Sequence, residues 1–464
     1  MNRPFVAPLI ILLGTALIIA CSTGTLWFDE ILSFQWAKSA KNPWQLLELY
    51  RHDNNHPLNT LWLMLLGENR PPWAYRALSI VSGIVSLILI HRLAVRLSPR
   101  FAWVPLLLAA TSFPLVLYFS EARGYAPAIA CLLGAYATLT GNGRANWRVP
   151  LFWLLCILAI LAHATALTIL AAMGAASLFR GVFEKQKPFE LIGSLSLWFG
   201  LPLFAAIIFL LFFLKEMMVA GGPEYPLPLV IAHLFRYAFG IPSATPGSMA
   251  LAVAGMAIIG SALAFGKFPD PASRFFFIGA ILVFPALSLI SADTTFLYFR
   301  YFLVSLPFIY LLAGPATERL SQSSRLITIS AVLLCVVSII GQIPRIWTLA
   351  TLGRGAYFDT FQKIASDSDP QKSIVSNNEM ELAILLSHFR RRFDFLEPLH
   401  CIPASKLETD IPHWIVYTSQ EDPPATPQIS LELNGQFYNL VSSHLSAPVS
   451  GTHWTLYQIQ PNTP

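Results

Sequence analysis

Residues 73–97 read WAYRALSIVSGIVSLILIHRLAVRL, and this stretch decides the fold of the chain. It contains no acidic residue, and a helix needs roughly 20 mostly apolar residues to cross a bilayer. Similar runs lie near residues 4–22, 101–119, 124–140, 191–214, 247–265, 274–291, 300–316 and 326–343. The sequence therefore predicts a polytopic α-helical membrane protein.

The composition of the 464-residue chain supports this reading and divides the chain in two. Only 12% of its residues are charged, against about 25% in soluble proteins. Residues 345–464 hold 8 of the 30 basic and 12 of the 25 acidic residues, a formal charge of −4, which leaves +9 for residues 1–344. The bases of the first part are scattered singly between apolar runs, so we expect no nucleic-acid partner.

The less apolar tail reads as a small α/β domain. After Gly353-Arg354-Gly355 the pattern becomes mixed, with strands expected at 373–376, 414–417 and 454–457 and a helix at 379–389. We predict a transmembrane domain at 1–344, whose first outer loop, 23–71, forms interfacial helices, and an extracytoplasmic α/β domain at 345–464.

The stretch 149–179 is too long for one straight span and short for two. Basic residues favour a hairpin, because cytoplasmic loops are enriched in Lys and Arg. With a hairpin, the later cytoplasmic loops carry seven bases, and three lie outside; a single span would invert that ratio. We therefore expect about eleven spans in the plasma (inner) membrane, with the N-terminus cytoplasmic.

The five cysteines give neither a disulfide framework nor metal-ligand spacing. Ile18-Ile19-Ala20-Cys21 also has the form of a lipoprotein signal, an alternative to a retained first span.

With this topology, charged residues of several segments gather at the outer surface. Asp29 and Glu30 follow the first span in Trp-Phe-Asp-Glu, and His56 precedes Pro57 in the same loop. Arg76 opens the second span, where a charge within an apolar run needs a partner or a path to water.

Further on, the turn Ser120-Glu121-Ala122-Arg123-Gly124-Tyr125 joins two spans, and Arg300 opens a late span. Each signal alone has an ordinary explanation, such as helix capping or a snorkelling arginine. Together they suggest a site for a lipid-borne phosphate and a sugar, because guanidinium groups suit phosphate oxygens and a carboxylate can deprotonate a hydroxyl.

In this order, the motifs resemble those of the integral membrane glycosyltransferases of the GT-C fold. The likeness is to the family 39-like branch, which includes protein mannosyltransferases and lipid A aminoarabinose transferases. The resemblance covers most of the chain, although each motif is short.

The resemblance implies inverting transfer of a hexose or pentose from a polyprenyl-phosphate carrier to an acceptor outside the membrane. Asp29 would be the general base and Glu30 its neighbour. Arg300 would bind the carrier phosphate, and His56, Arg76, Glu121, Arg123 and Tyr125 would help to bind donor or acceptor.

Two departures limit the resemblance. No large soluble module interrupts the spans, which weakens the expectation of a protein acceptor; lipid and glycan acceptors stay open. Glu121 stands where many relatives have glutamine. The outer loops contain no Asp-x-Asp, so the sequence predicts no certain cofactor and leaves a divalent metal open.

The alternative function is that of a transporter or lipid flippase, which the scarcity of acids within the spans disfavours.

Overall fold

The computed structural model describes residues 5–141, 146–219, 225–242, 247–291, 298–322, 325–366, 373–390, 399–406, 410–419, 426–447 and 449–460. The chain forms two compact units. Unit 1 comprises Met1–Ser22 and Ala40–Ile343, and unit 2 comprises Thr23–Ser39 and Pro344–Pro464.

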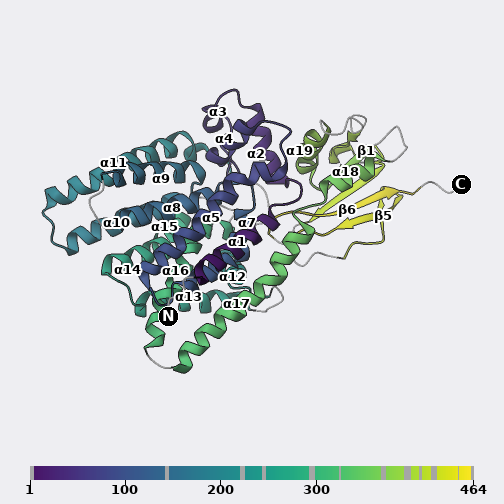
Figure 1. Cartoon of the computed structure of the whole chain (residues 1–464). Coiled ribbons are helices and arrows are strands. Elements are labelled where there is room, and N and C mark those ends of the chain that lie inside the picture. Colours follow the sequence, from purple (N-terminus) through teal and green to yellow (C-terminus); the bar gives the residue numbers. More distant parts are fainter. Residues whose placement is uncertain are drawn as a thin grey trace. The chain divides into compact units, whose positions relative to one another are not determined.

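The described part of unit 1 consists of helices and the loops that join them (Figure 1). Its α-helices are α1 (Val6–Cys21), α3 (Gln45–Glu48), α4 (Pro57–Leu66), α5 (Pro72–Leu97), α6 (Trp103–Ala110), α7 (Phe113–Phe119), α8 (Tyr125–Leu139), α9 (Arg148–Ala162), α10 (Ala166–Phe183), α11 (Pro188–Phe212), α12 (Leu227–Ala238), α13 (Ser248–Phe265), α14 (Pro271–Ile278), α15 (Phe284–Ser291), α16 (Leu306–Ser321) and the first part of α17 (Arg325–Leu352). A π-helical turn, η2 (Gly279–Val283), joins α14 to α15, and the described residues also form the 3₁₀ turns η1 (Leu214–Glu216) and η3 (Phe299–Ser305).

Among the described residues, six helices are long and apolar enough to cross a membrane, and six shorter apolar helices accompany them. The prediction of a polytopic helical membrane protein is therefore confirmed, whereas the number of eleven crossings stays a prediction. The stretch 149–179 forms the expected hairpin, since α9 ends at Ala162 and α10 begins at Ala166.

The expectation of one continuous span at 101–119 is wrong. The helix breaks between α6 and α7, where Ser112 adopts an extended backbone and its hydroxyl accepts a hydrogen bond from the Leu115 amide. Pro114, which has no amide hydrogen, occupies the first turn of α7. Capping serines and early prolines mark helix starts, so the local sequence begins a new helix here.

The described residues of unit 2 contain a six-stranded sheet in the order β2-β1-β3-β6-β5-β4. Its strands are β1 (Ser373–Ser376), β2 (His400–Cys401), β3 (Trp414–Ser419), β4 (Ser430–Leu433), β5 (Gln436–His444) and β6 (His453–Ile459). β1 runs parallel to β2 and β3, and the other neighbours are antiparallel. The expected strands at 373–376, 414–417 and 454–457 are confirmed, as is the helix, α19 (Glu379–Arg390).

Unit 2 also contains α18 (Tyr357–Ala365) and, from the beginning of the chain, α2 (Phe28–Ser39). Trp454 of β6 contacts the rings of Tyr357 and Phe361 at 5.0 and 6.0 Å between centroids. The side-chain amide of Gln35 donates to the Ile384 carbonyl at 2.9 Å, and Phe34 meets His388 edge to face. Helix α2 is thus packed on α19.

Glu381 is buried on α19 and makes unit 2 sensitive to pH. It accepts hydrogen bonds from Thr452 Oγ1 at 3.1 Å and Asn378 Nδ2 at 3.0 Å. Burial raises the pKa of Glu381 to about 7; the Thr452 hydrogen bond opposes this rise, and the negative charge of Asp29 adds to it. The folded protein therefore keeps a proton that the unfolded chain loses above its pKa of 4.5.

The free energy of unfolding should consequently fall as pH rises from 4.5 to about 7, and level off above. At about 1.4 kcal/mol per pKa unit, the decrease is on the order of 3 kcal/mol. Denaturant titrations of the whole protein across this range measure it. We expect Glu381→Gln to remove the slope and Glu379→Gln, an exposed acid on the same helix, to retain it; equal slopes in both variants would contradict the assignment.

Candidate functional site

A cluster of polar and aromatic side chains lies within unit 1 at the end of the bundle where α8 begins, α9 ends and α10 begins. Four short segments build it: the loop 50–56 before α4, the turn 120–124 between α7 and α8, the turn 163–165 between α9 and α10, and the 3₁₀ turn η3. Irregular backbone at helix ends can bring together side chains that are far apart in sequence, and buried turns of this kind need polar partners.

Gly124 lets the turn 120–124 approach its neighbours closely. A Cβ atom at this position would lie 1.8 Å from the Ala162 carbonyl oxygen and 2.8 Å from the His56 Cβ. Any other residue would push α9 and His56 away. The Asn59 side-chain amide holds the same turn by donating to the Ala122 carbonyl at 2.6 Å.

Two histidines and a tyrosine stack at this contact. The rings of His56 and His163 are 4.8 Å apart between centroids and nearly parallel, and Tyr125 lies 4.2 Å from His163 and 5.3 Å from His56. The Thr165 amide donates to His163 Nδ1 at 3.2 Å, so this nitrogen carries a lone pair in the neutral ring.

His56 is 3% exposed, and its Nε2 atom has no hydrogen-bond partner among the residues that the structure describes. Burial holds the pKa of the His56 imidazole well below its usual value, and the charges of His163, Arg123 and Arg300 lower it further. His56 is therefore neutral near pH 7 and can offer one N–H donor to a ligand.

Two arginines bring positive charge to the cluster. Arg123 is buried; its Nη2 donates to Asn54 Oδ1 at 2.9 Å, and its guanidinium carbon lies 5.2 Å from the centre of the Tyr125 ring. Arg300 lies over the ring of Tyr298 at 4.5 Å. Stacked guanidinium groups keep in-plane N–H donors available for oxygen ligands.

Asp53 is the acid at the centre of these contacts. His52 Nδ1 lies 2.9 Å from its Oδ1 atom, the Tyr301 hydroxyl donates a hydrogen bond to its Oδ2 at 3.3 Å, and Arg300 Nη2 lies 4.0 Å from Oδ2. Burial raises its pKa, but the His52 hydrogen bond and the charges of Arg300, His52 and Arg123 outweigh burial and leave the pKa lowered. Asp53 thus stays ionised and acts as a fixed partner for Tyr301 and Arg300. Because its pKa is lowered, its carboxylate is a weak base.

Glu121 and Arg76 are completely buried in unit 1. The Arg123 amide donates to the Glu121 carbonyl at 2.9 Å, so Glu121 belongs to the same tight turn as Arg123. Arg76 lies in the first turn of α5, and its Nη1 donates to the Ser22 carbonyl at 2.8 Å.

Asp29 and Glu30 belong to unit 2, in the first turn of α2. The Glu30 carboxylate accepts a hydrogen bond from the Trp27 amide at 3.0 Å, as an acid at a helix N-terminus should. Of the eight residues expected in the site, the structure therefore brings together His56, Arg123, Tyr125 and Arg300, with Glu121 close by.

Sequence reasoning missed the roles of Asp53 and His163. A feature of the sequence could have pointed to each of them. Asp53 lies in the polar run Arg-His-Asp-Asn-Asn-His at 51–56, and His163 is a polar residue in the middle of an apolar stretch. Within the described ranges, no group of three or more His, Cys, Asp or Glu side chains is placed to hold a metal ion.

No protein-family model and no curated protein matches the sequence. Solved structures do resemble the fold. ArnT from Cupriavidus metallidurans in the apo state superposes with a TM-score of 0.51 and 12% identity over 98% of each chain. ArnT bound to undecaprenyl phosphate gives 0.50 and 11% identity over 100% of this chain and 99% of that one. The chain thus has the GT-C membrane fold, as the sequence motifs predict.

Proposed function

We propose that the protein is a glycosyltransferase that moves a sugar from a polyprenyl-phosphate carrier to an acceptor at the outer face of the membrane. The observation that carries this proposal is the pair of arginines, Arg123 and Arg300, at one end of a GT-C membrane fold. Guanidinium groups are the preferred partners of phosphate. The similar structure of ArnT, a lipid A aminoarabinose transferase, is bound to undecaprenyl phosphate.

In the proposed reaction, an acceptor hydroxyl oxygen attacks the anomeric carbon of the sugar from the face opposite the phosphate. The new bond joins the acceptor oxygen to this carbon, and the bond between the carbon and the phosphate oxygen breaks. The proton of the hydroxyl passes to the Asp29 carboxylate, with Glu30 as its neighbour, and the carrier phosphate leaves with the bonding electrons. One displacement inverts the anomeric centre.

Positive charge favours this step because the leaving phosphate gains negative charge as its bond to the sugar breaks. Arg300 and Arg123 stabilise that charge more strongly in the transition state than in the bound donor. His56 donates a hydrogen bond from its neutral ring, and Tyr125 offers an aromatic face to the sugar. Arg76 and Glu121 help to shape the donor or acceptor pocket.

The proposal includes an orientation: the N-terminus is cytoplasmic, residues 345–464 are extracytoplasmic, and the membrane is the plasma (inner) membrane. It rests on the distribution of basic residues between the loops. The acceptor is a lipid, glycan or protein of the cell envelope.

A strain that lacks the protein should accumulate the donor. We expect its lipid extract to contain a polyprenyl-phosphate sugar that disappears when the wild-type gene is restored, as measured by mass spectrometry. The purified protein should then consume the donor in that extract and release polyprenyl phosphate. Equal amounts of every lipid-linked sugar in both strains, with no consumption in vitro, would rule out the proposal.

A further inference from the structure

A polar cavity of about 230 Å³ lies in unit 1, at the opposite end of the helices that build the candidate site. It is formed where α8 and α10 end and where α9, α11 and α14 begin. Helix α8 has 15 residues, so about 22 Å of helix separates this cavity from the candidate site. The cavity therefore lies too far from the candidate site to take part in the proposed transfer reaction.

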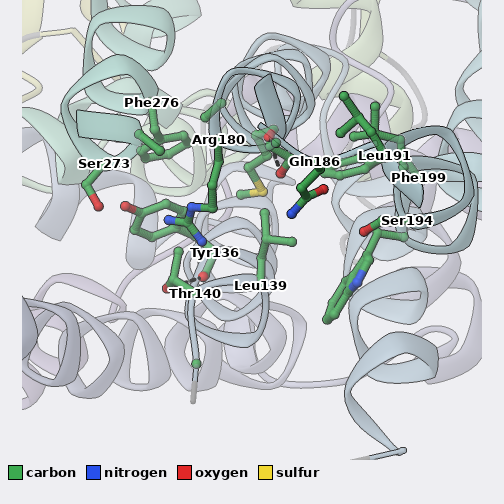
Figure 2. A pocket seen from close by; sticks show the side chains of 18 of the residues that line it. Tyr136, Leu139, Thr140, Arg180, Gln186, Leu191, Ser194, Phe199, Ser273 and Phe276 are labelled. Carbon is green, nitrogen blue, oxygen red and sulfur yellow. Dashed lines mark hydrogen bonds between the residues drawn. The ribbon is translucent and has the colours of Figure 1, made fainter. Parts of the chain in front are cut away.

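Two arginines lie on the wall of this cavity, together with hydroxyl and amide groups. Arg148 lies over the Trp198 ring at 5.7 Å and donates to the Thr138 carbonyl at 3.1 Å. Arg180 lies 3.6 Å from Asp270, which itself accepts hydrogen bonds from the amide and hydroxyl of Ser273. Figure 2 shows Arg180 beside Tyr136 and Ser273, with Thr140, Gln186 and Ser194 elsewhere around the cavity.

An apolar groove of about 570 Å³ adjoins the polar cavity. It follows α10 and α11, and Leu195 and Phe199 line both spaces. Its rims, Leu178 and Leu203, are 47% and 60% exposed, so the groove opens on the lipid-facing side of these apolar helices. A molecule that fills both spaces must have an anionic head and a hydrocarbon chain.

We propose that this composite site binds an anionic glycerophospholipid of the surrounding membrane. Arg180 and Arg148 receive the phosphate, the hydroxyl and amide groups receive the rest of the head group, and one acyl chain lies in the groove between α10 and α11. Basic pockets between transmembrane helices bind anionic head groups in this way. The charge of the cavity selects against zwitterionic lipids, and the attached groove selects against free phosphate.

Delipidated protein in detergent tests the site through the affinity for dioleoylphosphatidylglycerol, measured by native mass spectrometry. Dioleoylphosphatidylcholine, inorganic phosphate and farnesyl phosphate are the comparison ligands. Arg180→Gln should bind phosphatidylglycerol about fivefold more weakly, because one basic group near an anionic lipid contributes about this factor. Arg96→Gln, an exposed arginine at the same end of the bundle that does not line the cavity, should bind like the wild type.

Gly200→Leu provides a second test that leaves the arginines unchanged. Gly200 lines the groove, and a Cβ atom there meets nothing within 4 Å, so a larger side chain can start there and occupy part of the groove. We expect this variant also to lose phosphatidylglycerol. The inference is overturned if both variants bind like the wild type, if phosphatidylcholine binds as tightly, or if inorganic phosphate or farnesyl phosphate competes with phosphatidylglycerol on equal terms.

Discussion

Asp29→Asn should lower the rate of sugar transfer by about 10²–10⁴-fold, the usual contribution of a general base. Asparagine has the size of aspartate but cannot take the proton of the acceptor hydroxyl. We expect the variant to reach the membrane in normal amounts, because Asp29 lies in the first turn of a helix, where asparagine is well tolerated. Initial rates with the lipid-linked donor measure the effect.

Glu48→Gln is the matched control, since Glu48 is an exposed acid of the same loop. It should retain the wild-type rate. Full activity of Asp29→Asn would exclude Asp29 as the base and leave the proposed donor chemistry intact. Asp53 would then be a poor replacement, because His52, Tyr301 and Arg300 all stabilise its ionised form.

Arg300→Gln should reduce kcat/KM by about 10²–10³-fold, the loss measured when one group that stabilises developing negative charge is removed. The side chain lies on η3, directly before α16, so we expect the substitution to leave α16 folded. Arg300→Lys should recover part of the loss, because lysine restores the charge but lacks the planar fork.

Asp53→Asn distinguishes the contribution of the Arg300 charge from the contribution of the exact position of its guanidinium group. This variant keeps the guanidinium and removes the acid 4.0 Å away, so we expect a smaller loss than in Arg300→Gln. Arg300→Gln with a wild-type kcat/KM would show that the carrier phosphate binds elsewhere.

The apolar runs were enough to predict the fold class, because burial in lipid demands long apolar helices. The break at Ser112 was not predicted, since hydropathy averages over the residues that end one helix and begin the next. Helix α12 was also missed; it has only 12 residues, too few for a span. In the tail, Asn434-Gly435 was a readable hairpin signal, and both residues have positive φ between β4 and β5.

The candidate site was harder to predict than the fold. Arg123, Tyr125 and Arg300 could be proposed because charges and aromatic residues at the ends of spans are conspicuous. The stacking of His163 on His56 could not, because it depends on how closely α9 approaches the turn at Gly124, a tertiary distance that no periodicity contains.

The packing of α2 on α19 within unit 2 has a consequence for biosynthesis. About 350 residues separate Ser39, the end of α2, from Arg390, the end of α19. At 5–20 residues per second, a ribosome needs roughly 20–70 s to add them. During that interval the segment with Asp29 and Glu30 has been made but has no α19 to pack on. Helix α2 can therefore complete its packing within unit 2 only after most of the chain has been made.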